Sequence, residues 1–169
     1  MKKTVLTFGL LSGLVSASMM FGTMLFVERI GFDKGVIVGY TAITLSLLFV
    51  YFGVRSYRDN QLGGKITFGR AVGAGLLITL VSGLFYVAAW EFGSRRFFPD
   101  FSDKYGAFVM EEARAAGADQ ATLDAKEKEV AEMKRMMADP ILEPAMIFLE
   151  PLPVGLLVTL VSAAVLRKK

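Results

Sequence analysis

Three glutamates at the ends of long uncharged runs are the residues of this sequence whose type and position could do chemistry. Glu28 follows the first such run, Glu91 follows the third, and Glu150 stands just before the last. Arginines follow Glu28 and Glu91 within a few residues. Carboxylates in or beside lipid are costly unless they are paired or used. The pattern therefore indicates a site for an ion, a proton or a small cationic ligand, formed where the three run ends converge.

The alternative interpretation is that these carboxylates mark where lipid ends and stabilise helix termini. It is the simpler interpretation for Glu28 and Glu91. Glu150 differs because it interrupts an otherwise spanning run beside two prolines. Either a helix begins near Pro151 with Glu150 at its positive N-terminal end, or the helix is kinked at the proline and carries the carboxylate into the membrane.

The sequence contains no cysteine and no histidine. Thiolate and imidazole chemistry, and the metal sites built from those side chains, are thereby excluded, so carboxylates remain the only strong anionic ligands or bases. The segment GGK at 63–65 lacks the spacing of a phosphate-binding loop, and neither HExxH nor GxSxG occurs. We therefore expect no cofactor, no metal and no catalytic residue, and we do not expect an enzyme.

The elements that position the three glutamates are predicted to be membrane-spanning helices. Hydrophobic residues make up 54% of the 169 residues, which is more than a soluble domain of this size can cover. A helix over the first uncharged run would be about 34 Å long, enough for a hydrocarbon core of roughly 30 Å. The sequence predicts an all-α membrane protein in a lipid bilayer, one domain over 1–169 with four transmembrane helices. The predicted spans are 5–27, 36–54, 70–90 and 145–166.

The first uncharged run has a second interpretation. Lys2 and Lys3, the apolar stretch and then SAS at 16–18 resemble a cleavable secretory signal. Against cleavage, the apolar run continues unbroken to Val27. Cleavage would leave three spans with the same orientation.

Small residues recur along the predicted spans, often at intervals of four, so that one helix face lets another helix approach closely. We expect these residues to pack the helices of one chain together, with a homo-oligomer as the alternative. They are Gly9, Gly13, Gly69, Gly73, Gly75, Gly83 and Gly155.

A polar, helical insert at 95–139 separates the third and fourth predicted spans. Asp119 is placed to cap the second of its two predicted helices, which covers 120–138. An apolar stripe runs along that helix through Leu123, Val130, Met133 and Met137. The stripe indicates packing within the protein, and a partner-binding groove or a self-associating hairpin is the alternative.

Basic residues predict the orientation of the spans. The N-terminus, the loop 55–70 and the C-terminal tail hold nine basic residues and one acidic residue. The other connections, 28–35 and 91–150, hold ten basic and fifteen acidic residues. Short basic segments stay in the cytoplasm, so both termini are expected there, with the insert outside. Arg55 and Arg58 then act as topology determinants and lipid-headgroup contacts, and a regulatory or partner role for them is the alternative. Since the positive charge lies beside spans, the net charge of +3 does not point to nucleic acid.

Several motifs resemble those of one known family. They are YR at 57–58, GKITF at 64–68 opening the third span, Trp90 near its end, and FLEPLPVGL at 148–156 leading to a basic tail. Over nearly its whole length, the chain resembles the bacterial inner-membrane family called domain of unknown function 4199. The resemblance implies four helices with a soluble insert before the last, in the bacterial inner (plasma) membrane. It implies no activity and no catalytic residue.

Two functional hypotheses follow from these observations. The absence of catalytic constellations, together with an insert suited to binding, favours a non-catalytic scaffold or accessory subunit that binds other membrane proteins. The alternative is a small oligomeric transporter or channel that uses Glu150, which must assemble because four spans rarely enclose a pathway unaided.

Overall fold

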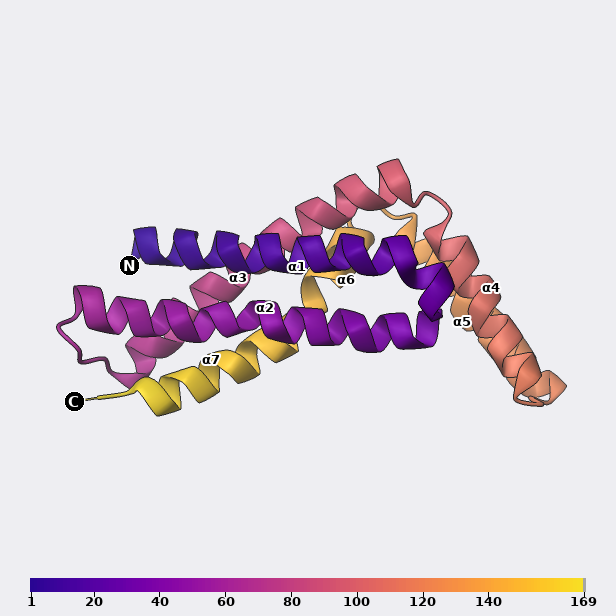
Figure 1. Cartoon of the computed structure of the whole chain (residues 1–169). Helices are drawn as coiled ribbons and strands as arrows, with labels where there is room; N and C mark the ends of the chain where they lie inside the picture. Colours follow the sequence, from indigo (N-terminus) through magenta and orange to yellow (C-terminus); the bar gives the residue numbers. More distant parts are fainter. Residues whose placement is uncertain (169) are drawn as a thin grey trace. The chain divides into compact units, whose positions relative to one another are not determined.

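The chain forms helices along nearly all of the part that the structure describes (Figure 1). The computed structural model describes residues 1–168 and, for Glu28, the backbone alone. The helices are α1 (Lys2–Ile30), α2 (Phe32–Gln61), α3 (Phe68–Phe97), α4 (Phe101–Ala115), α5 (Gln120–Met137), α6 (Leu142–Leu149) and α7 (Leu152–Leu166). Within residues 1–168, the only extended pairing is an isolated antiparallel bridge between Ile66 and Lys168.

Four helical segments are long and apolar enough to cross a membrane, which confirms the predicted number. They are Lys2–Val27, Phe32–Gln61, Phe68–Phe97 and Leu142–Leu166. The second and third extend well beyond the predicted spans. The difference arises because arginine, glutamate and glutamine are good helix formers, so that the helix continues after the uncharged run has ended.

A single residue joins α1 to α2. Gly31 has a φ of 88°, a conformation that glycine adopts without steric cost, and its N–H donates to the carbonyl oxygen of Val27 at 2.9 Å. The two helices then run side by side in opposite directions (Figure 1). This sharp reversal brings the end of α2 back to the level of the N-terminus.

The fourth segment that could span a membrane, Leu142–Leu166, is broken in its first half. α6 ends at Leu149 and α7 begins at Leu152, with Glu150 and Pro151 between them. Pro151 and Pro153 have no N–H to donate to the carbonyl oxygen four residues earlier, and the loss of these hydrogen bonds kinks or breaks a helix. The helix start near Pro151 is the first of the two arrangements that the sequence left open, and the entry of the carboxylate into the membrane, the second, stays a prediction. A helix begins after Pro151, a shorter helix precedes Glu150, and the carboxylate lies within the segment Leu142–Leu166.

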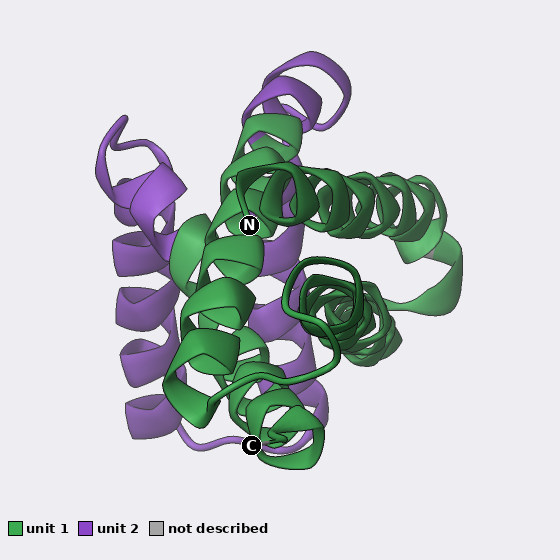
Figure 2. Ribbon diagram, turned by 90° about the vertical axis from the view of Figure 1, so that its left-hand side faces the viewer, with its two compact units in different colours: residues 1–90, 147–169 green, residues 91–146 purple. Residues whose placement is uncertain are grey.

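The chain divides into two compact units (Figure 2). The first consists of Met1–Trp90 together with Ile147–Lys169, and the second is Glu91–Met146. Three of the long helices and α7 thus lie mainly in the first unit, whereas α4 and α5 belong to the second.

Glycines and threonines interlock α3 with α7 in the first unit. A Cβ placed on Gly75 would lie 2.7 Å from Cγ2 of Thr159, and a Cβ placed on Gly155 would overlap Cγ2 of Thr79. The two threonines are 2% or less exposed. Each helix thus offers a glycine opposite a threonine of the other, and a larger residue at either glycine would force the two backbones apart.

A second pair of glycines lets α1 approach α3. A Cβ on Gly9 would lie 2.6 Å from the side chain of Val81, and a Cβ on Gly13 would lie 2.7 Å from that of Phe85. Gly83, on α3, is also a close contact, because a Cβ there would lie 2.9 Å from the ring of Phe148. These glycines therefore lie where side chains of neighbouring segments fill the space that a Cβ would need.

Gly69 and Gly73 behave differently from the other glycines of the predicted set. A Cβ on either would meet no atom within 4 Å, and both residues are exposed. The reason is their position around α3, whose buried face runs through Ala71 and Ala74 on the opposite side of the helix. This GxxxG pair does not pack against another helix of the same chain.

A chain of buried hydroxyl groups connects α1, α2 and α3. The hydroxyl of Ser82 donates to the hydroxyl of Ser12 at 2.9 Å, and Ser12 donates to the carbonyl oxygen of Ser46 at 2.8 Å. All three serines are buried. Hydrogen bonds of this kind between apolar helices contribute on the order of 1 kcal/mol each, so they add to the glycine contacts that hold the first unit together.

In the second unit, α4 and α5 form a two-helix hairpin. The side chain of Asp119 accepts a hydrogen bond from the N–H of Thr122 at 2.9 Å, which confirms the predicted cap of α5. Hydrogen bonding from Thr122 also lowers the pKa of the Asp119 carboxyl. The helices approach closely at Gly106, where a Cβ would lie 2.7 Å from the side chain of Val130.

Replacing Gly155 tests the interlocked packing of α3 and α7. We expect Gly155→Val to lower the thermal stability of the purified protein, because the added side chain overlaps Thr79 and overpacking typically costs about 1–3 kcal/mol. The measurement is the midpoint of thermal unfolding in detergent. The matched control is Gly73→Val, which introduces the same side chain on α3 in open space and should leave the midpoint within a degree or two. An equal decrease of the unfolding midpoint in the two variants would contradict this packing.

Candidate functional site

Glu150 lies at the break between α6 and α7, next to the buried Pro151. Because Pro151 and Pro153 lack an N–H, the carbonyl oxygens of Ile147 and Leu149 lose the donors that a continuous helix would supply. The break thus leaves two backbone carbonyl oxygens next to Glu150 in the sequence without their helical donors. Such breaks in spanning helices occur where the freed backbone groups meet other protein groups or water.

Tyr86 of α3 is the partner of this carboxylate. Its hydroxyl donates to Oε2 of Glu150 over 3.5 Å, a long hydrogen bond. Tyr86 is 8% exposed and Glu150 is half-buried. The carboxylate is therefore directed toward α3, inside the first unit, and its neighbour is a neutral hydroxyl group.

An apolar groove of about 660 Å³ runs beside the same break. Leu149 and Leu152, the residues on either side of Glu150 and Pro151, line it. The other lining residues are Leu76, Thr79, Leu80, Pro153 and Leu156. The groove therefore lies between α3 and the residues on both sides of the break.

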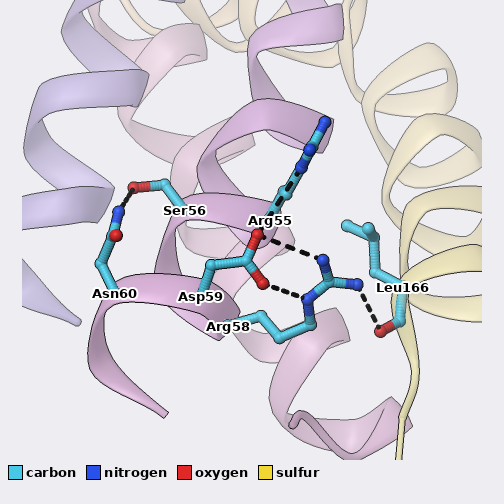
Figure 3. A network of polar contacts seen from close by, with 6 residues as sticks. All are labelled: Arg55, Ser56, Arg58, Asp59, Asn60 and Leu166. Carbon is cyan, nitrogen blue, oxygen red and sulfur yellow. Dashed lines mark hydrogen bonds and ion pairs between the residues drawn. The ribbon is translucent and has the colours of Figure 1, made fainter. Parts of the chain in front are cut away.

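Arg58 lies at the opposite end of the first unit and joins α2 to α7 (Figure 3). Its Nε and Nη2 contact the two carboxylate oxygens of Asp59 at 2.6 and 3.2 Å. Its Nη1 donates to the carbonyl oxygen of Leu166 at 3.3 Å. The guanidinium group thus caps the C-terminal end of α7, where carbonyl oxygens have no helical donor.

The neighbours of Arg58 hold this arrangement in place (Figure 3). Arg55 lies 3.6 Å from the carboxylate of Asp59, one turn away on α2. On the same turn, Asn60 donates to the hydroxyl of Ser56 at 3.1 Å. Asp59 is therefore shared between two arginines, and its charge fixes the fork of Arg58 toward α7.

Glu91 belongs to the second unit, at the end of α3. One of its oxygens pairs with Nη2 of Arg95 at 2.6 Å, one helical turn further on. The other oxygen, Oε1, is buried and has no hydrogen-bond partner among the described residues, and the same holds for Oγ of Ser94. Glu91 is thus partly satisfied as a local ion pair, with one polar atom that lacks a partner.

The predicted convergence of Glu28, Glu91 and Glu150 stays a prediction. The side chain of Glu28 lies outside the described residues, and Glu91 and Glu150 belong to different units. Within the described residues, no group of three or more acidic side chains is placed to hold a metal ion. The structure therefore describes Glu150 with Tyr86, and Glu91 with Arg95, as two separate pairs.

A groove of about 550 Å³ lies along the hairpin of the second unit. From α4 it is lined by Tyr105, Val109, Glu112, Ala113 and Ala116, and from α5 by Lys126, Glu129, Val130 and Met133. None of the 18 residues of α5 is buried. Val130 and Met133 belong to the apolar stripe that the sequence predicts, so part of that stripe remains open instead of being covered within the hairpin.

Sequence reasoning missed two contacts that define the first unit. It did not connect Tyr86 to Glu150, since the pairing of α3 with α7 leaves no local signal. It also gave no role to Ser12, Ser46 and Ser82. Serine is common in spanning helices, so only the packing of the helices distinguishes a buried hydrogen-bonded serine from others.

These features define a class: a helical protein with four segments that are long and apolar enough to span a membrane, one of them broken at a carboxylate. Residues 7–168 match the family described as protein of unknown function (DUF4199). Because the match covers nearly the whole chain, the protein belongs to that family, as its motifs indicated. No curated protein and no solved structure matches the chain.

Substitutions at Arg58 test its role in joining α2 to α7. We expect Arg58→Gln to increase amide hydrogen exchange severalfold at the C-terminal end of α7, because the carbonyl oxygen of Leu166 loses its charged donor. Arg58→Lys should show most of this effect, since a lysine keeps the charge but not the planar fork. The control Arg114→Gln changes an exposed arginine of the second unit and should leave this exchange unchanged. A full rescue by lysine would show that charge alone is required.

Proposed function

We propose that this protein is a non-catalytic scaffold or accessory subunit that binds other membrane proteins. In this proposal it resides in the bacterial inner membrane with both termini in the cytoplasm, and it acts as no enzyme. The basic loop 55–70 and the basic tail support the orientation, because they hold seven of the basic residues against one carboxylate.

The observation that carries the proposal is the open groove of the α4–α5 hairpin. A two-helix hairpin in water gains stability when its apolar stripe is covered, yet α5 has no buried residue. Val109, Val130 and Met133 line the groove together with the charged Glu112 and Glu129. A groove lined by apolar and charged side chains is suited to the amphipathic helix of a partner.

Site-specific photo-crosslinking tests this proposal in intact cells. A photoreactive residue at Met133, in the groove, should give a defined crosslinked product with another membrane protein. The same residue at Glu127, on α5 but outside the groove lining, should give none. Introducing Val109→Asp, in the groove lining, should abolish the product at Met133. A product that is equally strong at both positions, or none at either, would contradict a partner-binding groove.

A second candidate function is transport by an oligomer, and Glu150 is the observation that favours it. Its carboxylate is half-buried within a spanning segment and faces a tyrosine hydroxyl instead of a cation. Carboxylates in such positions are characteristic of ion and proton pathways.

The test of transport is flux of protons or monovalent cations into proteoliposomes that contain the purified protein. If Glu150 carries the pathway, Glu150→Gln should reduce the flux at least tenfold and Tyr86→Phe should reduce it severalfold. The control Glu111→Gln changes an exposed carboxylate of α4 and should have no effect. If the flux does not exceed that of empty vesicles, transport is not a function of this protein. If the flux is unchanged in Glu150→Gln, Glu150 takes no part in the transport.

A further inference from the structure

We propose that the end of the first unit where the loop 62–67 meets the C-terminal tail is a preformed binding surface for anionic phospholipid headgroups. This surface, called here the cationic end, goes beyond the scaffold function. It requires neither the hairpin nor a particular orientation of the protein.

The cationic end carries many exposed positive charges and very little negative charge. Its exposed cations are Lys2, Lys3, Arg55, Lys65, Arg70, Arg167 and Lys168. Asp59 is the acidic residue of the segments that form it, and this carboxylate is already engaged by Arg58 and Arg55. The excess of positive charge is therefore available to ligands outside the chain.

Three contacts between distant parts of the chain bring these cations together. Ile66 and Lys168 exchange two backbone hydrogen bonds of 3.0 Å, which fix the C-terminal tail to the loop 62–67. Arg58 binds the last carbonyl oxygen of α7. Gln61 donates to the hydroxyl of Thr4, which ties the end of α2 to the beginning of α1. The loop, the tail and the beginning of α1 thus lie at one end of the first unit (Figure 1).

The position of these cations along the helices matches the depth of lipid phosphates. Lys2 opens the first spanning segment, Arg70 lies in the first turn of the third, and Arg167 directly follows the last. Ammonium and guanidinium groups at such positions donate charge-assisted hydrogen bonds to phosphate oxygens. Each basic residue held at the surface of an anionic membrane strengthens the attraction, on the order of fivefold in affinity.

The shape of the cationic end favours headgroups over a single soluble anion. Its cations are exposed and come from several segments around the end of the helices, so they match several phosphates in one plane better than one phosphate in a pocket. A bilayer that surrounds the spanning segments presents such a plane. Soluble phosphate shares the same chemistry, and the experiment separates the two sources.

Native mass spectrometry of the purified full-length chain tests this inference. The protein in detergent is titrated with phosphatidylglycerol or with phosphatidylcholine of the same acyl chains, and bound lipid is counted at each concentration. We expect at least a tenfold preference for phosphatidylglycerol. The triple variant Lys65→Gln, Arg70→Gln, Lys168→Gln should weaken phosphatidylglycerol binding by about a hundredfold, following the per-charge effect, and should leave phosphatidylcholine binding unchanged.

Two further variants keep the result decisive. The triple variant Arg114→Gln, Lys128→Gln, Arg135→Gln removes the same charge from the second unit and should retain the preference. The double variant Lys65→Arg, Lys168→Arg keeps the positive charge at the cationic end and should also retain the preference for phosphatidylglycerol. This result would show that substitution at these positions does not by itself abolish lipid binding. Three results would overturn the inference. They are an equal loss of phosphatidylglycerol binding in the two triple variants, no preference for phosphatidylglycerol in the unaltered chain, and displacement of the lipid by millimolar inorganic phosphate.

Discussion

The reciprocal fit of glycine and threonine between α3 and α7 is the contact on which the rest of the first unit depends. Gly75 receives Thr159, and Gly155 receives Thr79, so the two backbones approach as closely as their atoms allow. Where apolar side chains are surrounded by lipid, burial gives little driving force, and close packing with a few hydrogen bonds must hold helices together. Two glycines on α1, Gly9 and Gly13, extend the same principle to the opposite side of α3.

The features of functional interest follow from this contact. Because α7 is held against α3, the break that precedes it places Glu150 beside Tyr86 and opens an apolar groove between the two helices. The same alignment brings the C-terminal end of α7 to the loop 62–67, where Arg58 caps it and Lys168 pairs with Ile66. One packing arrangement thus sets both the position of the carboxylate and the gathering of the cations.

The sequence predicted where helices lie along the chain, because that depends on local residues. It did not predict which helix faces pack against each other. Uncharged runs of sufficient length identified the four spanning segments, and Asp119 identified the start of α5 by its capping chemistry. The partner of each helix face is not encoded locally, so the exposed pair Gly69 and Gly73 looked the same in sequence as the packed Gly75 and Gly83. For the same reason the sequence marked Glu150 as unusual without revealing Tyr86, and it gave no role to Ser12.

We propose that each of the four long apolar segments crosses a membrane once, with the loop after α2 in the cytoplasm and the α4–α5 hairpin outside. The chain has no cysteine, so a single cysteine introduced at Asn60 or at Ala121, both exposed, reports its own location. In spheroplasts treated with a membrane-impermeant maleimide, the account predicts labelling of Ala121→Cys in intact cells and of Asn60→Cys only after permeabilisation. Labelling of both, or of Asn60→Cys alone, in intact cells would contradict it.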